Sequence, residues 1–549
     1  MKIFYLSNLF VLLFLTAFGF NAQAGEKIKS GTENTIEGYI SPNQYDIDIL
    51  NYDLSIDLYP QQKLLKGNAT LTGVITNKKI SRLDLNFYDN LKITDATIDG
   101  KPAKYERTST SISFPLNEIS KDTFKVNIVY QGTPKKMGLS SFVFGEINSQ
   151  SVVYTLNEPE YASTWFPCDD RPDDKALLDI KITNDSSQVS VSNGKLMGIT
   201  TGGSRRTYRW KTVYPISTYL ICLYSSDYKE FDDKYVSQDK ADTMAIKYFV
   251  FPNQLEDAKI DFSDHVDMMN YFAKTFGEYP FIKEKYGVAE FLWQFGAEEH
   301  QTITGVGSIF VGGKKLFNDL YSHELSHQWF GDAVGLKSWK EIWLNEGFAS
   351  YCEALYAEHV GGPGALRSTM MSKFHSQFSD KLYNPEDLFS QTVYDKGAWV
   401  LHMLRWEIGD SAFFKSMRNY FETYKYKNAS IGDFKKICEN VSGKNLDYFF
   451  RQWIFEGTGI INATYKWDTD ENGDTYKLEI NLNQTQKGFN AYKFLLEAKV
   501  KFEDNSTQFI KFEVNKREQT SEFSFKKEPV AVIFDPHDWI LGTFTQDKN

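Results

Sequence analysis

The sequence predicts a multidomain α+β protein with an antiparallel β domain, an α-rich domain and a C-terminal β-sandwich, in that order. The chain of 549 residues is longer than a single hydrophobic core usually serves. Apolar and polar residues alternate up to about residue 245 and again after about residue 460, as is typical of strands. Between these zones the apolar residues recur every three or four positions, as in amphipathic helices.

The first zone is expected to form a β domain over residues 25–248. Tyr52, Leu54 and Ile56 alternate with polar neighbours, and Asp99-Gly100 is typical of a turn between strands. This patterning favours a large antiparallel β domain.

The second zone, residues 249–457, is expected to be α-rich, and the third, residues 458–549, to form a β-sandwich. The helical spacing is clear from Phe262 to Phe276, and the alternation returns from Tyr476 to Leu482. A tail of roughly 90 residues with this pattern has the size of a β-sandwich.

Residues 1–24 have the pattern of a secretory signal peptide. Lys2 precedes an apolar run from Leu9 to Phe20, which is followed by Ala22-Gln23-Ala24. The run is short for a membrane span, and no later stretch reaches roughly 18 apolar residues. We therefore expect export to the periplasm or the medium and no membrane span after cleavage near Gly25, with an uncleaved N-terminal anchor as the alternative.

Composition excludes some functions. The chain has 72 acidic and 61 basic residues, and its net charge of −11 argues against a nucleic-acid-binding surface. Its four cysteines are widely spaced and form no C-x-x-C motif, so isolated thiols are expected, although pairing of Cys168 with Cys222 stays open.

A metal-binding pattern lies in the α-rich zone. In His323-Glu324-Leu325-Ser326-His327, four helical steps bring both imidazoles to one face, where they can bind one ion. Glu324 lies beside that face and is suited to act as a base on a metal-bound water. Eighteen residues separate His327 from Glu346. Two His and one Glu leave a fourth position open, which is the arrangement of catalytic zinc.

These segments resemble the M1 family of zinc aminopeptidases, which belongs to the gluzincins. The resemblance rests on His323-Glu324-x-x-His327-Gln328-Trp329-Phe330-Gly331 followed by Asn345-Glu346-Gly347-Phe348-Ala349, and it extends over nearly the whole mature chain. It implies a thermolysin-like catalytic domain and one Zn²⁺ per chain, held by His323, His327 and Glu346, with Glu324 as general base and proton carrier. The end of the chain after the β tail resembles the short bacterial members, which lack a C-terminal helical domain.

Two further segments extend the resemblance to the substrate. Val393-Tyr394-Asp395-Lys396-Gly397-Ala398 implies that the Tyr394 hydroxyl stabilises the oxyanion, for which a phenol donor is suited. Asn157-Glu158-Pro159 implies that Glu158 is one of two carboxylates around the substrate α-amine. The family's nearby Gln is Leu156 here, so the preference for the first residue stays open.

Gly296-Ala297-Glu298-Glu299-His300 resembles the family segment G-x-M-E-N. It implies that Gly296 and Ala297 line the substrate site and that Glu299 binds the free α-ammonium. Glu298 and His300 depart from the family's Met and Asn. Glu298 either favours basic substrates or points to solvent, and His300 either keeps the backbone hydrogen bonds of Asn or moves the edge strand.

Two other carboxylate patterns each allow two interpretations. Glu353 follows Glu346 by two helical turns and either orients a ligand histidine or is a solvated surface carboxylate. Asp468 to Glu479 fits a twelve-residue calcium loop, but the flanking alternation and Asn472-Gly473 favour a β-hairpin instead.

The sequence therefore predicts an exported zinc aminopeptidase whose partners are peptides with a free N-terminus. A zinc endopeptidase or an epoxide hydrolase on the same scaffold is the first alternative, although an endopeptidase would not need Glu158 and Glu299. A binding protein that keeps the fold without the chemistry is the second alternative, which the full set of ligands, base and tyrosine disfavours.

Overall fold

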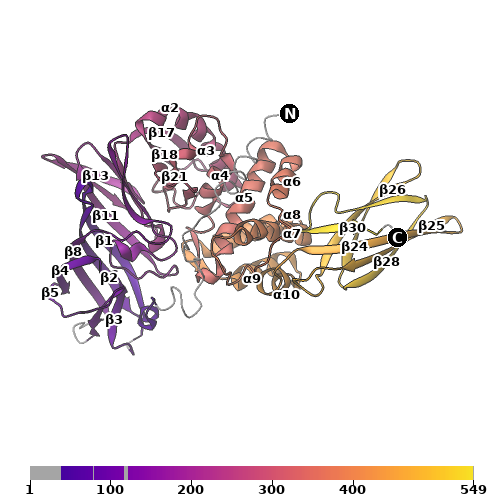
Figure 1. Cartoon of the computed structure of the whole chain (residues 1–549), viewed down its shortest axis with the longest axis horizontal. Coiled ribbons are helices and arrows are strands. Elements are labelled where there is room, and N and C mark those ends of the chain that lie inside the picture. Colours follow the sequence, from indigo (N-terminus) through magenta and orange to yellow (C-terminus); the bar gives the residue numbers. More distant parts are fainter. Residues whose placement is uncertain (1–38, 78, 117–121, 548–549) are drawn as a thin grey trace. The chain divides into compact units, whose positions relative to one another are not determined.

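The computed structural model describes residues 39–77, 79–116 and 122–547 and divides into two compact units (Figure 1). The first unit comprises the chain up to Trp339 together with Phe421–Ser430. The second comprises Lys340–Tyr420 and the chain from Ile431 onward. The expected signal peptide, residues 1–24, lies outside the described residues.

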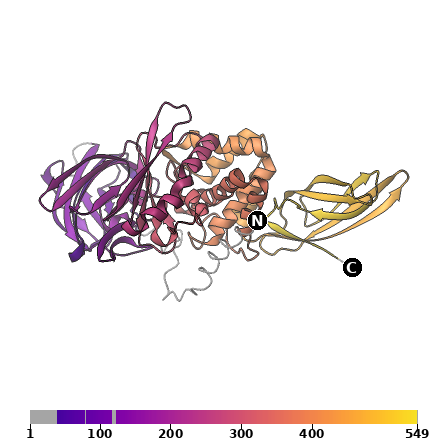
Figure 2. The same cartoon turned by 90° about the horizontal axis from the view of Figure 1, so that it is seen from above.

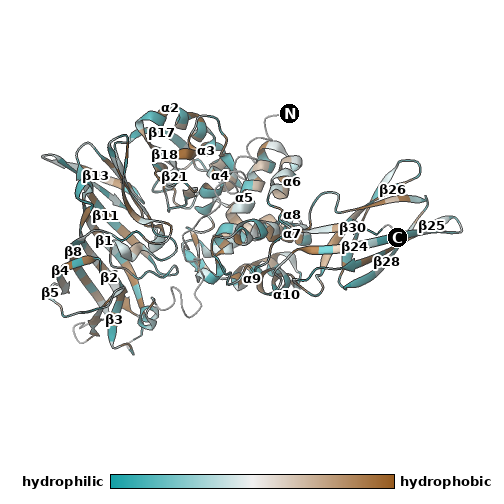
Figure 3. Ribbon diagram, viewed as in Figure 1, coloured by the Kyte–Doolittle hydropathy of each residue, from teal (hydrophilic) through white to brown (hydrophobic). Residues whose placement is uncertain are grey.

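The first unit begins with a large, mostly antiparallel sheet in the order β13-β14-β11-β1-β2-β8-β4-β5. Hydrophobic and hydrophilic residues alternate along its strands (Figure 3), and Tyr52, Leu54 and Ile56 of β1 are buried as the sequence predicts. β1 pairs antiparallel with β2 and parallel with β11. The strands are β1 (Ile47–Tyr59), β2 (Leu64–Ile75), β4 (Leu91–Ile98), β5 (Lys101–Pro102), β8 (Thr123–Gly132), β11 (Lys175–Asp185), β13 (Lys195–Gly202) and β14 (Arg205–Lys211).

Smaller sheets complete the N-terminal β region. A four-stranded sheet has the order β12-β16-β10-β9, and a three-stranded sheet has the order β3-β7-β6. Strand β10 ends at Leu156, directly before the segment that carries Glu158. The strands are β9 (Ser141–Ile147), β10 (Gln150–Leu156), β12 (Val189–Ser192), β16 (Leu223–Ser226), β3 (Arg82–Asn86), β6 (Glu106–Arg107) and β7 (Ser111–Pro115).

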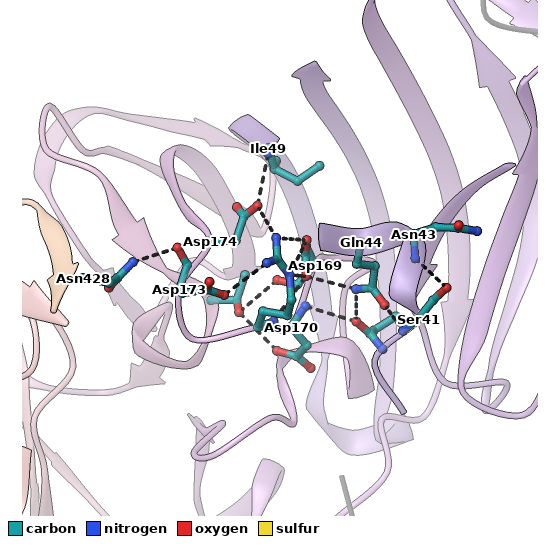
Figure 4. Close-up of polar contacts among 12 residues, drawn as sticks. Ser41, Asn43, Gln44, Ile49, Asp169, Asp170, Asp173, Asp174 and Asn428 are labelled. Atoms are coloured by element: carbon teal, nitrogen blue, oxygen red, sulfur yellow. Dashed lines mark hydrogen bonds and ion pairs between the residues drawn. The ribbon is translucent and has the colours of Figure 1, made fainter. Parts of the chain in front are cut away.

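A buried polar network fixes the chain between β10 and β11 (Figure 4). The Arg171 guanidinium donates to Asp169 at 3.0 Å and to Asp174 at 3.4 Å, and the Gln44 amide donates to Asp169 at 3.0 Å. Asp170 accepts from the Ser163 hydroxyl at 2.8 Å. Because buried charges and amides are stable only when they are paired, this network rigidly connects the segment after Glu158 to the sheet.

A five-stranded mixed sheet in the order β17-β18-β19-β21-β20 supports the first half of the candidate site. The parallel pairs are β18–β19 and β19–β21, and β20 is an antiparallel edge strand. The helical spacing from Phe262 to Phe276 is confirmed as a short 3₁₀ turn followed by α3. Strands β19 and β21 of this sheet, which lie inside the α-rich zone, were not predicted. The elements are β17 (Lys229–Val236), β18 (Thr243–Val250), α2 (Leu255–Asp261), α3 (His265–Phe276), β19 (Tyr286–Phe291), β20 (Ala297–Glu298), β21 (Thr304–Gly307) and α4 (Asn318–His327).

A short parallel pair of strands completes the first unit. β22 (Val334–Leu336), which follows α4, pairs with β23 (Lys427–Ala429), which comes from the late segment of this unit.

The second unit combines a helical bundle with the C-terminal strands. The predicted helical zone is confirmed, and its longest helix carries Glu346 near its start. The helices are α5 (Trp343–Gly361), α6 (Pro363–Ser372), α7 (Gly397–Ile408), α8 (Asp410–Tyr424), α9 (Ile431–Ser442) and α10 (Asp447–Phe450).

The C-terminal strands, yellow to orange in Figure 2, form the predicted sandwich. Its two sheets have the orders β28-β25-β24-β30 and β27-β26-β29. Rings from the two sheets meet between them, as Tyr465 and Phe534 do with centroids 4.2 Å apart. The predicted hairpin is confirmed, because Asn472 pairs with Thr475 and Gly473 has a φ of 63°. The strands are β24 (Ile461–Asn472), β25 (Thr475–Gln484), β26 (Phe494–Phe502), β27 (Thr507–Val514), β28 (Glu518–Phe525), β29 (Pro529–Phe534) and β30 (Gly542–Gln546).

Tryptophan stacking joins the sandwich to helix α7. Trp539 stacks on His402 at a centroid distance of 4.4 Å and on Trp406 at 5.2 Å, and the Trp406 indole donates to the Leu495 carbonyl at 2.8 Å. The cysteines are buried and form no disulfide, as expected for isolated thiols: Cys168, Cys222, Cys352 and Cys438. Within the described ranges, no helix is both long enough and apolar enough to cross a membrane.

Candidate active site

Helix α4 carries the predicted H-E-x-x-H residues, and all three functional side chains are buried. His323, Glu324 and His327 are 7%, 4% and 1% exposed. The two imidazole centroids are 4.8 Å apart, with the ring planes at 72°. The spacing of four residues on a helix therefore brings both rings to one face, as the sequence predicts.

The tautomer of His327 suits a metal ligand. Its Nδ1 lies 3.1 Å from the carbonyl oxygen of Phe330. Because a carbonyl only accepts, Nδ1 carries the proton and Nε2 keeps its lone pair. An N–H donated to a carbonyl is the usual support of a metal-binding imidazole, so the donor set on α4 fits Zn²⁺.

A partly buried lysine holds the turn that follows α4. Lys175, at the start of β11, donates its Nζ to the carbonyl of Asp332 at 2.5 Å and to that of Ala333 at 3.2 Å. Burial lowers the pKa of Lys175 to about 7. Burial also raises the pKa of the Asp332 carboxyl, and the nearby Glu299 carboxylate raises it further. Sequence reasoning missed both residues, because a lone Lys far from the motif carries no local signal.

Glu299 follows the edge strand β20. Gln328, which directly follows His327, connects this segment to α4: its amide nitrogen donates to the Glu299 carbonyl at 3.2 Å, and its amide oxygen accepts from the Thr302 N–H at 2.8 Å. Ligand-type atoms of Glu299, Glu324 and His327 lie within 4.8 Å of one another. The predicted amine-binding residue therefore lies beside the predicted base.

Glu158 lies on the loop after β10, which its neighbour Asn157 fixes. The Asn157 amide donates to the Ile221 carbonyl at 2.5 Å and accepts from the Trp165 indole at 2.9 Å. Carboxylate oxygens of Glu158 and Glu299 lie within 4.8 Å of each other, and both side chains are buried. Two buried carboxylates this close together suit a cation such as an ammonium group.

The two departures from the family segment are both internal. Glu298 is 2% exposed, so the expectation that it points to solvent is wrong. The edge strand is kept, because Ala297 pairs with Val306 and Glu298 with Gly305. His300 is fully buried, and its Nδ1 lies 2.7 Å from the Tyr224 hydroxyl. The preference for basic substrates stays a prediction.

In the second unit, Glu346 lies in the first turn of α5 and is 2% exposed. The helix dipole favours a carboxylate at that end. Its neighbour Gly347 packs against Gly397 of α7. A Cβ added at Gly347 would lie 3.0 Å from the Gly397 Cα, and one added at Gly397 would lie 2.8 Å from the Gly347 Cα. The two helices therefore touch backbone to backbone beside Glu346, which only glycines allow.

Tyr394 lies in a π-helical turn, Thr392–Lys396, that leads into α7. Such turns occur frequently at functional sites because they reorient a side chain within a helix. Lys396 anchors the turn by donating its Nζ to the carbonyls of Asp380 at 2.9 Å and Gly457 at 2.7 Å. Burial lowers the pKa of Lys396 to about 7.

Glu353 lies on α5 and forms an ion pair with Lys373 at 2.7 Å. The same lysine Nζ is 3.6 Å from Asp395, the residue after Tyr394. The Glu353 side chain is 13% exposed, so it is not the solvated carboxylate of the alternative interpretation. Its proposed role in orienting a ligand histidine stays a prediction.

The structure thus divides the predicted residues between the two units. The first unit brings together the two histidines, the predicted base and the two predicted amine-binding carboxylates. Its edge strand before Glu299 begins at Ala297, directly after Gly296. The second unit carries the third predicted ligand, the tyrosine and the helix carboxylate: Glu346, Tyr394 and Glu353.

Comparison with known families finds two matches. The sequence profile of the Peptidase M1 N-terminal domain matches residues 44–220, and that of the Peptidase family M1 domain matches residues 265–453. Together they cover more than half of the chain.

Curated relatives give the same picture. Probable aminopeptidase 2 of Sulfurisphaera tokodaii is 27% identical over 434 residues, which are 74% of this chain and 53% of that protein. Aminopeptidase N of Lactococcus lactis is 24% identical over 456 residues, which are 76% of this chain and 52% of that protein. The chain therefore spans about half the length of the curated relatives it matches.

Solved structures share the fold. The M1 zinc metallopeptidase from Deinococcus radiodurans is 25% identical with a TM-score of 0.67, and the match covers 74% of this chain and 93% of that one. Aminopeptidase A of Legionella pneumophila, solved in complex with aspartic acid, has a TM-score of 0.81 over 95% of this chain and 61% of that one. At 18% identity, the latter likeness speaks for the fold alone.

Proposed function

Because the chain belongs to peptidase family M1, we propose that it is a zinc aminopeptidase that removes N-terminal residues from peptides. The predicted family and fold class are confirmed. The observation that carries the proposed activity is the proximity of Glu158 and Glu299 to each other, and of Glu299 to Glu324 and His327. A base beside an ammonium-binding carboxylate pair selects the first peptide bond of a substrate.

His323 and His327 would hold the zinc ion, with Glu346 as the third ligand. When bound, zinc supplies a Lewis acid that polarises the scissile carbonyl and lowers the pKa of water. The buried imidazoles and the His327 tautomer support this assignment, and the relatives described as zinc metallopeptidases agree with it.

The remaining roles belong to the side chains of this chain. Glu324 would accept the proton of the attacking water and deliver it to the leaving amine. The Tyr394 hydroxyl would donate to the oxygen on which negative charge develops. Glu158 and Glu299 would bind the α-ammonium, which orients the first peptide bond and excludes substrates whose amine is blocked.

The experiment is the hydrolysis of aminoacyl arylamides by the mature protein. Each substrate is supplied free and N-acetylated, with and without a zinc chelator. Chelator-sensitive cleavage of the free forms alone would support an aminopeptidase, and the panel would rank the first-residue preference, including a basic one. Equal cleavage of the acetylated forms would point to an endopeptidase, and no cleavage together with no bound zinc would point to a binding protein.

Export is part of the same proposal and rests on the pattern of residues 1–24. N-terminal sequencing of the protein recovered from the periplasm and from the medium tests it. A mature start near Gly25 would support it, and an intact Met1 in the cytoplasm would overturn it.

A further inference from the structure

The residues on either side of Glu299 form an internal pair. Glu298 is 2% exposed and His300 is fully buried. Glu298 Oε1 lies 4.0 Å from His300 Nε2, an electrostatic contact slightly longer than a hydrogen bond. Because the two side chains are this close, a substitution of either residue changes the electrostatic environment of the other.

The protons of His300 follow from its neighbours. Burial lowers the pKa of His300 to about 3, so the ring is neutral and has a single N–H. A nearby carboxylate favours an N–H over a nitrogen lone pair, so the favoured tautomer has the proton on Nε2, facing Glu298. Nδ1 then accepts from the Tyr224 hydroxyl at 2.7 Å. Burial raises the pKa of Tyr224, so the phenol keeps the proton that it donates.

The sheet is shaped to admit Tyr224. Gly305 of β21 is the register partner of Glu298. A Cβ at Gly305 would lie 2.2 Å from the Tyr224 hydroxyl oxygen, so only glycine leaves room for this hydroxyl to reach His300. The Tyr224 ring also meets the imidazole edge to face, with centroids 5.6 Å apart.

The same segment is held from the side of α4. The Gln328 amide nitrogen lies 3.2 Å from the Glu299 carbonyl oxygen and 3.5 Å from that of His300. The backbone that carries Glu299 is therefore fixed by Gln328 on one side and by the His300 ring on the other. Movement of either would displace the Glu299 carboxylate.

We propose that Glu298, His300 and Tyr224 form a positioning relay that aligns Glu299 with the substrate α-amine, and that the first two residues are energetically linked. The proposal rests on the proposed aminopeptidase function. None of the three residues needs to touch the substrate, so each acts through Glu299. The two departures from the family segment are then a single coupled change.

A double-mutant cycle tests the link. E298M leaves the buried imidazole N–H without its carboxylate, and H300N leaves the carboxylate without the imidazole. Each single exchange is expected to raise KM for a free aminoacyl arylamide roughly tenfold with a smaller change in kcat. The double variant E298M/H300N should recover to within about threefold, because removing both partners of a buried polar pair costs less than removing one.

Denaturant unfolding of the same four proteins provides a readout that does not need activity. The denaturant midpoint of each single variant should fall. The decrease in the double variant should be smaller than the sum of the two single decreases. If wild-type protein cleaves no arylamide, the proposed function fails while this cycle still tests the pair. Additive effects on both KM and unfolding would overturn the link.

Matched controls separate positioning from general destabilisation. His265 is also buried, among aromatic rings, so H265N combined with E298M should be additive. Y224F removes only the hydroxyl and should raise KM severalfold, whereas Y228F, which removes the hydroxyl bonded to the Glu290 carbonyl, should not. If the exchanges at 298 and 300 prevent folding, Y224F carries the test, and an unchanged KM would overturn the relay.

Discussion

Each half of the candidate site is anchored by a lysine, which is partly buried in the first half and fully buried in the second. Lys175 donates to the carbonyls of Asp332 and Ala333 after α4, and Lys396 donates to those of Asp380 and Gly457 beside the π-helical turn. Burial lowers the pKa of both ammonium groups to about 7. The two lysines make the same kind of hydrogen bond, but the contacts around them differ between the two halves of the site.

The first half is held by polar side chains distant in sequence. Lys175 reaches from β11 to the turn that follows α4, and Gln328 bonds to the edge-strand segment about thirty residues earlier. The second half is held by shape, because Gly347 and Gly397 allow α5 and α7 to touch. Substitutions that remove a polar group should therefore lower activity most in the first half. Substitutions that add side-chain volume should lower it most in the second half.

The largest effect is expected from E324Q, which replaces the proposed base in the first half of the site. A neutral amide cannot accept the proton, so kcat should fall about 10²- to 10⁴-fold while zinc is retained. Steady-state rates and metal content of the purified variant measure this. D319N, on the exposed side of the same helix, is the control and should keep wild-type rates. A near-normal rate in E324Q would refute the role of Glu324.

Y394F tests the chemistry of the second half without changing its shape. Loss of one donor to the developing oxyanion should lower kcat about 10²-fold and change KM less, since that bond strengthens in the transition state. Substrate saturation curves separate the two constants. A change confined to KM would instead make Tyr394 a substrate-binding residue, and Y476F in the C-terminal hairpin should change neither.

The local part of the site was predictable, because helical geometry relates residues four apart whatever surrounds them. His323 and His327 share one face for that reason, and the hairpin at Asn472-Gly473 follows from turn chemistry in the same way. The alternation of β1 and the spacing of α3 were likewise visible in the sequence.

The long-range part was not predictable from one sequence. Nothing local connects Lys175 with Asp332, or Tyr224 with His300, because those contacts exist only after the strands have paired. Strands β19 and β21 were missed because they are short and fully buried, so they lack alternation. The burial of Glu298 could be predicted only with knowledge of the strand register, in which Glu298 of β20 pairs with Gly305 of β21.

A steric test of the second half is G397A. The added Cβ would lie 2.8 Å from the Gly347 Cα, so the helices must separate, at a cost of about 1–3 kcal/mol in the free energy of unfolding. The rate should also fall severalfold as Glu346 moves. G364A in α6 is the matched control, because its Cβ meets no atom within 4 Å and alanine favours the helix. Equal unfolding midpoints in both variants would contradict close packing at Gly397.

The last stability test concerns pH and uses the two lysines together. Between pH 7 and about 10.4 each of these two lysines binds more protons in the unfolded chain than in the folded one, because burial lowers the pKa of Lys175 and Lys396 to about 7. The contribution of each lysine to the free energy of unfolding should therefore rise with pH in that window, by at most about 1.4 kcal/mol per pH unit. K175M and K396M should each flatten this rise, whereas K314M, at an exposed lysine, should not.

Activity measured on the same variants then distinguishes the two anchors. K175M removes the donor to the turn that follows His327, so this variant should have a severalfold lower kcat. K396M should lower kcat less, because the contact between Gly347 and Gly397 still holds the second half of the site in place. Equal losses in the two variants would mean that the lysines, rather than the glycine contact, determine the geometry of both halves.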